Sequence, residues 1–289
     1  MMPQTMHILA LAGALCSAAA TIFIRQGLRG SEPYAGFWIN LVVGTIGLWA
    51  AVIFTGLGHV STRGALFFVL AGLIGTVGGR LLRFFAIEKV GASIAAALIN
   101  LNPFVASALA IALLGERITL PIVVGTVVIV AGTTLLSIGG KRLGFRSGQL
   151  ALPLLSAVCF GVVAVLRKLG LSGTGAVVGS AINVTTALVA FTAFLLASGR
   201  PEVMVCRGRS LAHFTAAGLL ENAGVFMNVV ALSLGTVSIV APLYGTAPIF
   251  VLFLAPFFLR DVETLSGRVI LGTLLIVLGV YLITALSGR

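Results

Sequence analysis

Residues 33–58 read PYAGFWINLVVGTIGLWAAVIFTGLG, an uninterrupted stretch without Asp, Glu, Lys or Arg. A transmembrane α-helix needs about 20 residues of this kind. Charged residues divide most of the remaining chain into similar stretches at 8–24, 64–79, 90–115, 118–140, 147–166, 169–199 and 269–288. The stretch 214–259 contains one acid, Glu221, and is long enough for two spans with a break near residues 234–238. The sequence therefore predicts ten transmembrane helices.

Composition excludes a water-soluble domain. Of the 289 residues, 59% are hydrophobic and 9% are charged, and the mean hydropathy is +1.19. A soluble fold could not bury that much apolar surface. The runs are continuously apolar, without an alternating set of polar residues, which favours helices over a membrane β-barrel. We predict an all-α, multi-pass membrane protein.

The net charge of +11 has the pattern of loop charge and not of a nucleic-acid-binding surface. Lys and Arg punctuate the apolar runs instead of clustering in one patch, as is typical of loops that face anionic lipid headgroups. We therefore expect the lipid bilayer as a partner and no nucleic acid.

The chain contains an internal repeat. Shifting the sequence by 143 residues places Cys16 on Cys159 and Ile39-Asn40 on Ile182-Asn183. With small gaps the correspondence continues, pairing Ser93-Ile94 with Ser238-Ile239, Pro103 with Pro248, Glu116 with Glu263, Gly125-Thr126 with Gly272-Thr273 and Gly132 with Gly279. These pairs predict five-helix repeats at 1–140 and 147–289, joined by a linker at 141–146. Because five is odd, the repeats must be inverted, as in many secondary transporters.

One part of the repeat resembles a known family. Asn102-Pro103, then Leu114-Gly115-Glu116-Arg117-Ile118-Thr119 and a glycine-rich fifth span, resemble the signature of the drug/metabolite transporter superfamily, ten-helix EamA branch. The second copy keeps Pro248 but has Arg260-Asp261-Val262-Glu263-Thr264 in place of Gly-Glu-Arg. The resemblance extends to the YddG-like aromatic amino acid exporters, although no motif isolates that subgroup.

The resemblance implies a secondary transporter of the bacterial inner membrane, with a central cavity, that exports small metabolites such as amino acids, aromatic ones among them. An exporter of lipophilic drugs or other metabolites is the alternative within this class. A membrane-embedded enzyme is the alternative outside it, but the sequence has no His-Glu-x-x-His motif and no Walker loop. We therefore expect neither an enzyme nor a cofactor or metal.

Two ionisable residues at membrane depth are the first candidates for the substrate site, because a charge inside a span is costly and is usually functional. Mapping the limits of the eighth span back onto its repeat partner extends the third helix to about Ile87, which places Arg80 roughly 10 Å below the surface. Glu221, early in the eighth span, lies at a similar depth. We expect Arg80 to bind a substrate carboxylate and Glu221 to bind an ammonium group or a transported proton. A structural ion pair between them, or snorkelling of Arg80 and Arg83, is the alternative.

Polar residues near these two complete the predicted substrate site. Asn222 adjoins Glu221, and Asn228 lies seven residues on, hence on the same helix face. Asn100 and Asn102 precede Pro103, and Tyr244 lies between Pro242 and Pro248. Prolines at matching positions of two halves predict interrupted helices, which often form a transporter's site. Interhelical hydrogen bonds and plain kinks remain the alternative roles for these residues.

Overall fold

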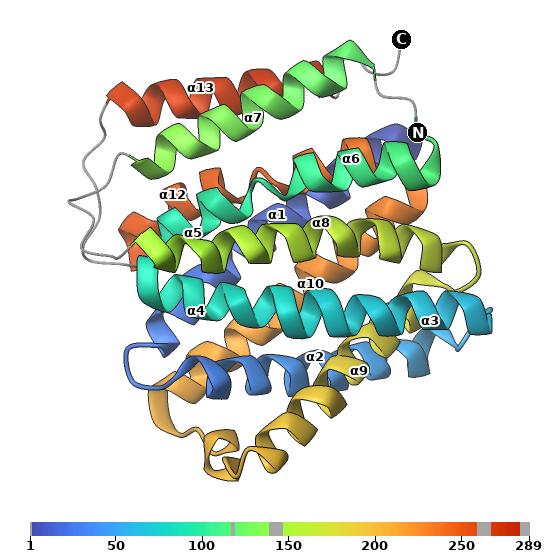
Figure 1. Ribbon diagram of the computed structural model, residues 1–289, viewed down its shortest axis with the longest axis vertical. Coiled ribbons are helices and arrows are strands. Elements are labelled where there is room, and N and C mark those ends of the chain that lie inside the picture. Colours follow the sequence, from blue (N-terminus) through green and yellow to red (C-terminus); the bar gives the residue numbers. More distant parts are fainter. Residues whose placement is uncertain (1, 117–118, 139–146, 259–266, 284–289) are drawn as a thin grey trace.

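The chain folds into packed helices (Figure 1). The computed structural model describes residues 2–116, 119–138, 147–258 and 267–283. The helices of the first half are α1 (Met2–Gly27), α2 (Pro33–Thr55), α3 (Thr62–Ala71), η1 (Gly72–Arg80), α4 (Leu81–Val90), α5 (Ala92–Ile99), α6 (Asn102–Leu114) and α7 (Leu120–Ile138). Those of the second half are η2 (Ser147–Leu150), α8 (Ala151–Leu171), α9 (Ala176–Ala197), η3 (Pro201–Met204), α10 (Gly208–Leu234), α11 (Val237–Tyr244), α12 (Ala247–Phe258) and α13 (Gly267–Tyr281).

The all-helical, membrane-spanning fold class is confirmed. Six helical segments are long and apolar enough to cross a membrane, namely Gln4–Gly27, Pro33–Thr55, Thr62–Val90, Gly148–Leu171, Ala176–Ala197 and Gly208–Leu234. Shorter apolar helices follow each group of three. In the described part of the chain, β pairing is limited to an isolated bridge between Val60 and Thr174. The total of ten spans and the boundaries 1–140 and 147–289 stay predictions, and the linker 141–146 lies outside the described residues.

The third helical segment passes the end of its uncharged stretch and carries charge into the membrane. It runs without a break from Thr62 to Val90, slightly beyond the predicted end at Ile87. Its middle, η1, is a π-helix that contains Gly72, Gly75, Gly78 and Gly79 and ends at Arg80. Ser156 Oγ donates a hydrogen bond of 2.7 Å to the carbonyl of Gly79. The neighbouring helix α8 thereby supplies a hydrogen-bond donor for a backbone carbonyl near the end of η1.

Two of the predicted spans are interrupted at matching places of the repeat, as their prolines predicted. The stretch 90–115 forms α5 and α6, with a turn at Asn100 and Leu101 between them. The equivalent stretch forms α11 and α12, with a break at Gly245 and Thr246. A side chain on Gly245 would collide with Oδ1 of Asn100, so the two breaks lie against each other.

Two boundaries differ from the sequence prediction. Helix α10 begins at Gly208 and not near Phe214, because residues 208–213, which include Arg209, Ser210 and His213, form its first turns. Helix α8 does not end before Arg167 but continues to Leu171. Both differences place basic residues inside helices. The predicted break near residues 234–238 is confirmed, since α10 ends at Leu234 and α11 begins at Val237.

The two halves are interleaved rather than stacked end to end. Helix α1 packs along α10. Its repeat equivalent α8 packs along α3 and η1. Helix α2 packs on α9, and α7 on α13, so each helix of these pairs meets its own repeat equivalent. Figure 1 shows α7 and α13 side by side at one edge of the bundle. The interior therefore receives side chains from both halves.

Charged side chains also fix one end of the broken helices. The carboxylate of Glu116 accepts hydrogen bonds from the backbone N–H groups of Val237 (2.9 Å) and Ser238 (3.0 Å), at the first turn of α11. Nζ of Lys168 donates to the carbonyls of Leu232 (2.7 Å) and Gly235 (2.6 Å), at the last turn of α10. Acids at helix N-termini and bases at C-termini stabilise the exposed peptide groups there. This assigns Glu116 a structural role at the junction between α10 and α11.

Candidate functional site

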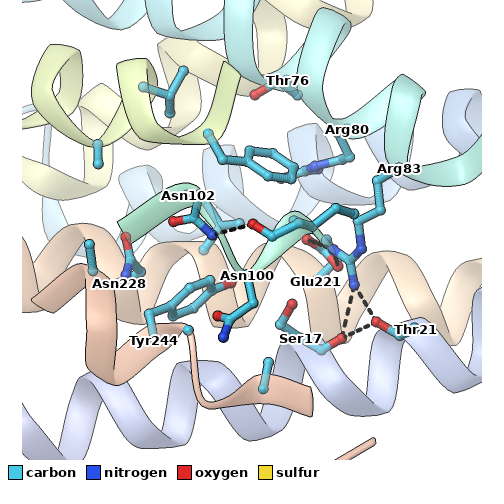
Figure 2. A pocket seen from close by; sticks show the side chains of 18 of the residues that line it. Ser17, Thr21, Thr76, Arg80, Arg83, Asn100, Asn102, Glu221, Asn228 and Tyr244 are labelled. Carbon is cyan, nitrogen blue, oxygen red and sulfur yellow. Dashed lines mark hydrogen bonds and ion pairs between the residues drawn. The ribbon is translucent and has the colours of Figure 1, made fainter. Parts of the chain in front are cut away.

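A cavity of about 110 Å³ lies where the broken helices meet α1, α4, α8 and α10 (Figure 2). Its wall contains polar side chains from both halves: Ser17, Thr21, Thr76, Arg80, Arg83, Asn100, Asn102, Arg167, Glu221, Asn228 and Tyr244. Apolar side chains complete it, among them Ile87, Ile99, Phe160, Val163, Val225, Leu232 and Val251. Buried polar groups gathered around a cavity within apolar helices are the pattern of a transport site.

Most of the predicted site residues lie together in this cavity. Arg80, Glu221, Asn228, Asn100, Asn102 and Tyr244 are all among its lining residues. Asn222 is not a lining residue, but it accepts a hydrogen bond from Arg80, which is one. The structure thus brings these residues to one cavity, while the individual contacts differ from the predicted ones in two places described below.

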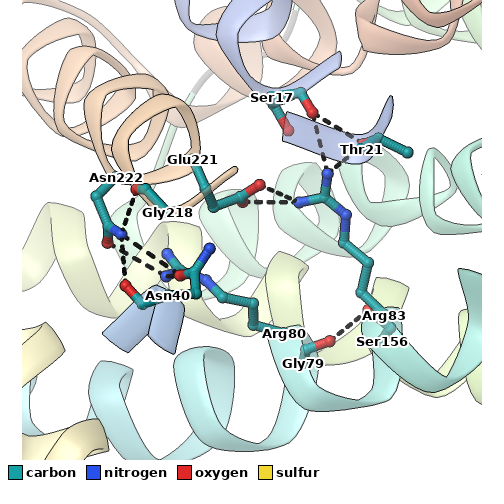
Figure 3. Close-up of polar contacts among 10 residues, drawn as sticks. All are labelled: Ser17, Thr21, Asn40, Gly79, Arg80, Arg83, Ser156, Gly218, Glu221 and Asn222. Atoms are coloured by element: carbon teal, nitrogen blue, oxygen red, sulfur yellow. Dashed lines mark hydrogen bonds and ion pairs between the residues drawn. The ribbon is translucent and has the colours of Figure 1, made fainter. Parts of the chain in front are cut away.

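Glu221 pairs with Arg83 and not with Arg80, which corrects the predicted ion pair. Nη1 of Arg83 lies 2.7 Å from both carboxylate oxygens of Glu221. Nη2 of Arg83 donates to the carbonyl of Ser17 at 3.1 Å and to the hydroxyl of Thr21. Figure 3 shows this arrangement, which joins α1, α4 and α10. Arg83 is therefore buried rather than snorkelling to the surface.

Arg80 ends the π-helix η1, and Arg83 lies in the α-helix α4 that follows it. A π-helical turn contains more residues than an α-helical one, so the side chains that follow η1 are rotated relative to an α-helical count. Arg83 contacts α1 and α10, whereas Arg80 contacts Asn40 of α2 and Asn222 of α10. The cluster of glycines at 72–79 was the signal in the sequence, because glycine weakens α-helical preference.

Arg80 is held by two amides. Its Nη1 donates to Oδ1 of Asn40 at 2.8 Å and to Oδ1 of Asn222 at 3.2 Å (Figure 3). Nδ2 of Asn222 donates in turn to the carbonyls of Asn40 (3.0 Å) and Gly218 (2.8 Å). A side chain on Gly44 would collide with the Asn222 amide. Asn222 therefore positions Arg80, and Gly44 allows α2 to approach closely enough for this contact.

Arg167 is a site residue that the sequence prediction missed. It is 8% exposed, lines the cavity, and donates from Nη2 to Oδ1 of Asn183 at 3.0 Å. Oδ1 of Asn183 also accepts a hydrogen bond of 3.2 Å from Thr76. Two consecutive basic residues, Arg167 and Lys168, suggested the end of a span. The repeat gave no signal for Arg167, because its equivalent at a shift of 143 residues is Ile24.

The repeat-related asparagines thus have equivalent roles. Asn40 in α2 holds Arg80, which the first half supplies, and Asn183 in α9 holds Arg167, which the second half supplies. Nδ2 of Asn183 also donates to the carbonyl of Phe68 at 3.3 Å. Each asparagine therefore anchors one guanidinium of its own half at the wall of the cavity.

Charge in the cavity is not balanced. Three guanidinium groups and one carboxylate line it, which leaves an excess of two positive charges. The four ion pairs found among the described residues include Arg83 with Glu221, but none that involves Arg80 or Arg167. Guanidinium groups stay protonated in proteins. The site is therefore electrostatically prepared for a negatively charged group.

The remaining predicted residues lie at the helix breaks. Asn102 donates from Nδ2 to the carbonyl of Ile99 at 2.9 Å, across the α5–α6 turn. Asn100 is 2% exposed beside Gly245, and Tyr244 ends α11. Asn228 faces the same cavity as Glu221, as its spacing predicted. Among the described residues, no three His, Cys, Asp or Glu side chains are placed to hold a metal ion.

Comparisons with known proteins agree with the fold and the repeat. The EamA-like transporter family matches the chain twice, at residues 4–138 and 147–285. A solved structure described only as the crystal structure of a protein superimposes with a TM-score of 0.80 at 19% identity, covering 99% of this chain and 98% of that one. None of the curated proteins matches. With both halves of the chain matched by one family, this multi-pass membrane protein belongs to the EamA-like transporters and carries small molecules across a membrane.

Proposed function

We propose that this protein is a secondary transporter that exports small metabolites from a bacterial cell by alternating access to the central cavity. In this proposal ten spans form two inverted five-helix repeats, and the protein lies in the inner membrane. The observation that carries the proposal is the position of the cavity, walled by charged groups and by the broken helices of both halves. Rocking two inverted halves about such a site is a known route to alternating access.

The interleaved packing supports the inversion. If α1 and α8 are equivalent, then their contacts with α10 and with α3 and η1 are also equivalent. Exchanging the conformations of the two halves would move the same cavity wall from one opening to the other. Members of the EamA-like family are not enzymes, and the cavity residues described here are suited to binding a charged group, which does not favour the enzyme alternative.

The expected export of amino acids, aromatic ones included, remains a proposal for the substrate class. Arg80 offers guanidinium nitrogens to a carboxylate, and Asn100, Asn102, Asn228 and Tyr244 offer neutral polar contacts. Glu221 would serve an ammonium group or a proton only after leaving Arg83. A lipophilic cation is disfavoured as cargo, because the excess charge of the cavity is positive.

Uptake into proteoliposomes tests the transport function. The purified protein would be reconstituted and supplied with radiolabelled amino acids, organic acids, sugars and lipophilic cations, with and without a pH gradient. We expect saturable uptake of a carboxylate-bearing class, which Arg80→Ala reduces at least about tenfold. Arg63→Ala, at an exposed residue outside the cavity, is the matched control. If the folded protein gives no uptake of any probe above that of liposomes without protein, the proposal is contradicted.

A further inference from the structure

Arg80 and Arg167 share an unusual situation in the cavity wall. They are 2% and 8% exposed, and within the described ranges neither contacts a carboxylate. Their side-chain hydrogen bonds all go to neutral amides. A buried charge normally has a counter-ion, because removing it from water is costly. In this cavity both cations lack a carboxylate counter-ion among the described residues.

The carboxylate of the cavity wall is already engaged. Both oxygens of Glu221 contact one nitrogen of Arg83, whose other terminal nitrogen contacts α1. Among the lining residues, Glu221 is the single acid. The pair is therefore neutral as a unit, and the two positive charges that remain belong to Arg80 and Arg167.

Both guanidiniums retain donors for a ligand. The contacts of Arg80 with Asn40 and Asn222 use Nη1 alone, and the contact of Arg167 with Asn183 uses Nη2. Nε of Arg167 has no hydrogen-bond partner among the described residues. Guanidinium groups bind carboxylate and phosphate oxygens through paired N–H groups. Each arginine can thus donate hydrogen bonds to one anionic group.

The two arginines lie near each other on the cavity wall. Thr76 and Arg80 are four residues apart in η1, and Thr76 contacts Asn183, which anchors Arg167. The two guanidiniums are therefore linked through one element, because Arg80 ends η1 and Thr76 of the same helix contacts the amide that anchors Arg167. The lining of the cavity also includes apolar side chains such as Phe160 and Val163, which suit a short carbon skeleton.

We infer that the cargo is a small organic dianion whose two negative charges bind at Arg80 and Arg167. This inference rests on the proposed transport function and narrows its substrate class. A short dicarboxylate offers one anionic group to each arginine, whereas a phosphate monoester carries both charges on one group that would have to bridge the two arginines. A zwitterionic amino acid fits less well, because its ammonium group would meet the positive excess of the cavity while Glu221 is occupied by Arg83.

Ligand binding by the wild-type protein in detergent is the first test. Succinate, glycerol phosphate, acetate, glutamine and choline would be added separately, at equal ionic strength, and the thermal unfolding temperature measured. A ligand that binds the folded state raises this temperature. We expect at least one of succinate and glycerol phosphate to raise the unfolding temperature, with an affinity at least about tenfold above that of acetate. Whichever of the two ligands binds more tightly shows whether the cargo is a dicarboxylate or a phosphate monoester.

Variants then assign the second charge to Arg167. We expect Arg167→Gln to raise the KM for dianion uptake into proteoliposomes about tenfold or more, while the KM for a monocarboxylate changes about twofold or less. Arg167→Lys keeps the charge and should recover part of the dianion preference. Arg63→Gln, at an exposed residue, should leave both values unchanged.

The outcomes separate this inference from the proposed function. Uptake of zwitterions or cations that dianions neither compete with nor replace would overturn the dianion and leave transport intact. Stabilisation by a dianion without uptake of any probe would support the binding site and overturn transport. If Arg167→Gln does not fold, wild-type competition by dianions and monoanions decides the inference, since equal inhibition constants would contradict it.

Discussion

At the scale of single residues, the buried pair of Arg83 and Glu221 holds three helices together through one guanidinium. Replacing Glu221 by Gln would leave Arg83 charged and buried without its counter-ion. We expect Glu221→Gln to lower the free energy of unfolding by about 3–5 kcal/mol, as is usual when one partner of a buried ion pair is removed. Thermal unfolding in detergent measures this loss.

The chain offers a matched control for this prediction. Glu32 pairs with Arg200 at 3.0 Å, but both side chains are 42% exposed. Water screens such a pair, so Glu32→Gln should change stability by less than about 1 kcal/mol. Equal unfolding temperatures for Glu221→Gln and Glu32→Gln would show that the interior pair is not the clamp described here.

Sequence reasoning located these residues better than it paired them. Charge at membrane depth identified Arg80 and Glu221, because a charged residue inside an apolar span needs a reason to be there. The partner of Glu221 was not predicted, because Arg80 and Arg83 lie one turn apart and both reach α10, at Asn222 and at Glu221 respectively. Arg167 was missed because a basic pair at the end of an apolar run usually marks a loop, whereas α8 continues past it.

At the scale of elements, α7 and α13 meet through glycines placed by the repeat. A Cβ atom on Gly132 would lie 2.7 Å from the carbonyl oxygen of Gly272, and one on Gly279 would lie 2.6 Å from that of Gly125. In the repeat, Gly125 corresponds to Gly272 and Gly132 to Gly279, so the contact is reciprocal. Small residues of this kind allow membrane helices to approach closely.

We expect Gly132→Ala to separate α7 from α13 and to destabilise the protein by about 1–3 kcal/mol, since the added methyl group meets rigid backbone. Gly47→Ala, within α2, is the control, because a Cβ atom there has no neighbour within 4 Å. Alanine favours a helix over glycine, so the control should be neutral or slightly stabilising. Thermal unfolding of both variants in detergent decides, and a Gly132→Ala protein as stable as the wild type would contradict the close contact.

Element types followed from the sequence more reliably than element limits. Apolar runs predicted helices, and prolines predicted the two interrupted spans, because proline cannot continue a helix without loss of a backbone hydrogen bond. The interruptions put Asn100 and Tyr244 at the cavity, as expected. The start of α10 at Gly208 was not predicted, since the polar residues of its first turns lack the apolar signal.

At the scale of the whole molecule, the repeat extends to single basic side chains that donate hydrogen bonds to backbone carbonyls. Arg25 donates to the carbonyl of Ile87 at 3.2 Å, and Lys168, its equivalent at a shift of 143 residues, donates to that of Leu232. The halves nevertheless differ at the cavity, where the first supplies two arginines and the second supplies Arg167 and Glu221. Sequence comparison of the halves predicted the shared framework, but these charges have no charged counterpart in the other half, so the repeat does not predict them.

The unpaired guanidiniums also constrain the transport cycle as a whole. An empty cavity would have to reorient with two uncompensated charges, at the electrostatic cost of moving charge through a medium of low dielectric constant, whereas a cavity filled with a dianion is close to neutral. Uptake of labelled dianion into liposomes preloaded with unlabelled dianion should therefore exceed uptake into empty liposomes about tenfold or more. In Arg167→Gln, where one charge is gone, preloading should matter less. If the cargo is a dianion, such a carrier therefore exchanges anions faster than it returns empty, and the gradient of the second anion helps to set the direction of export.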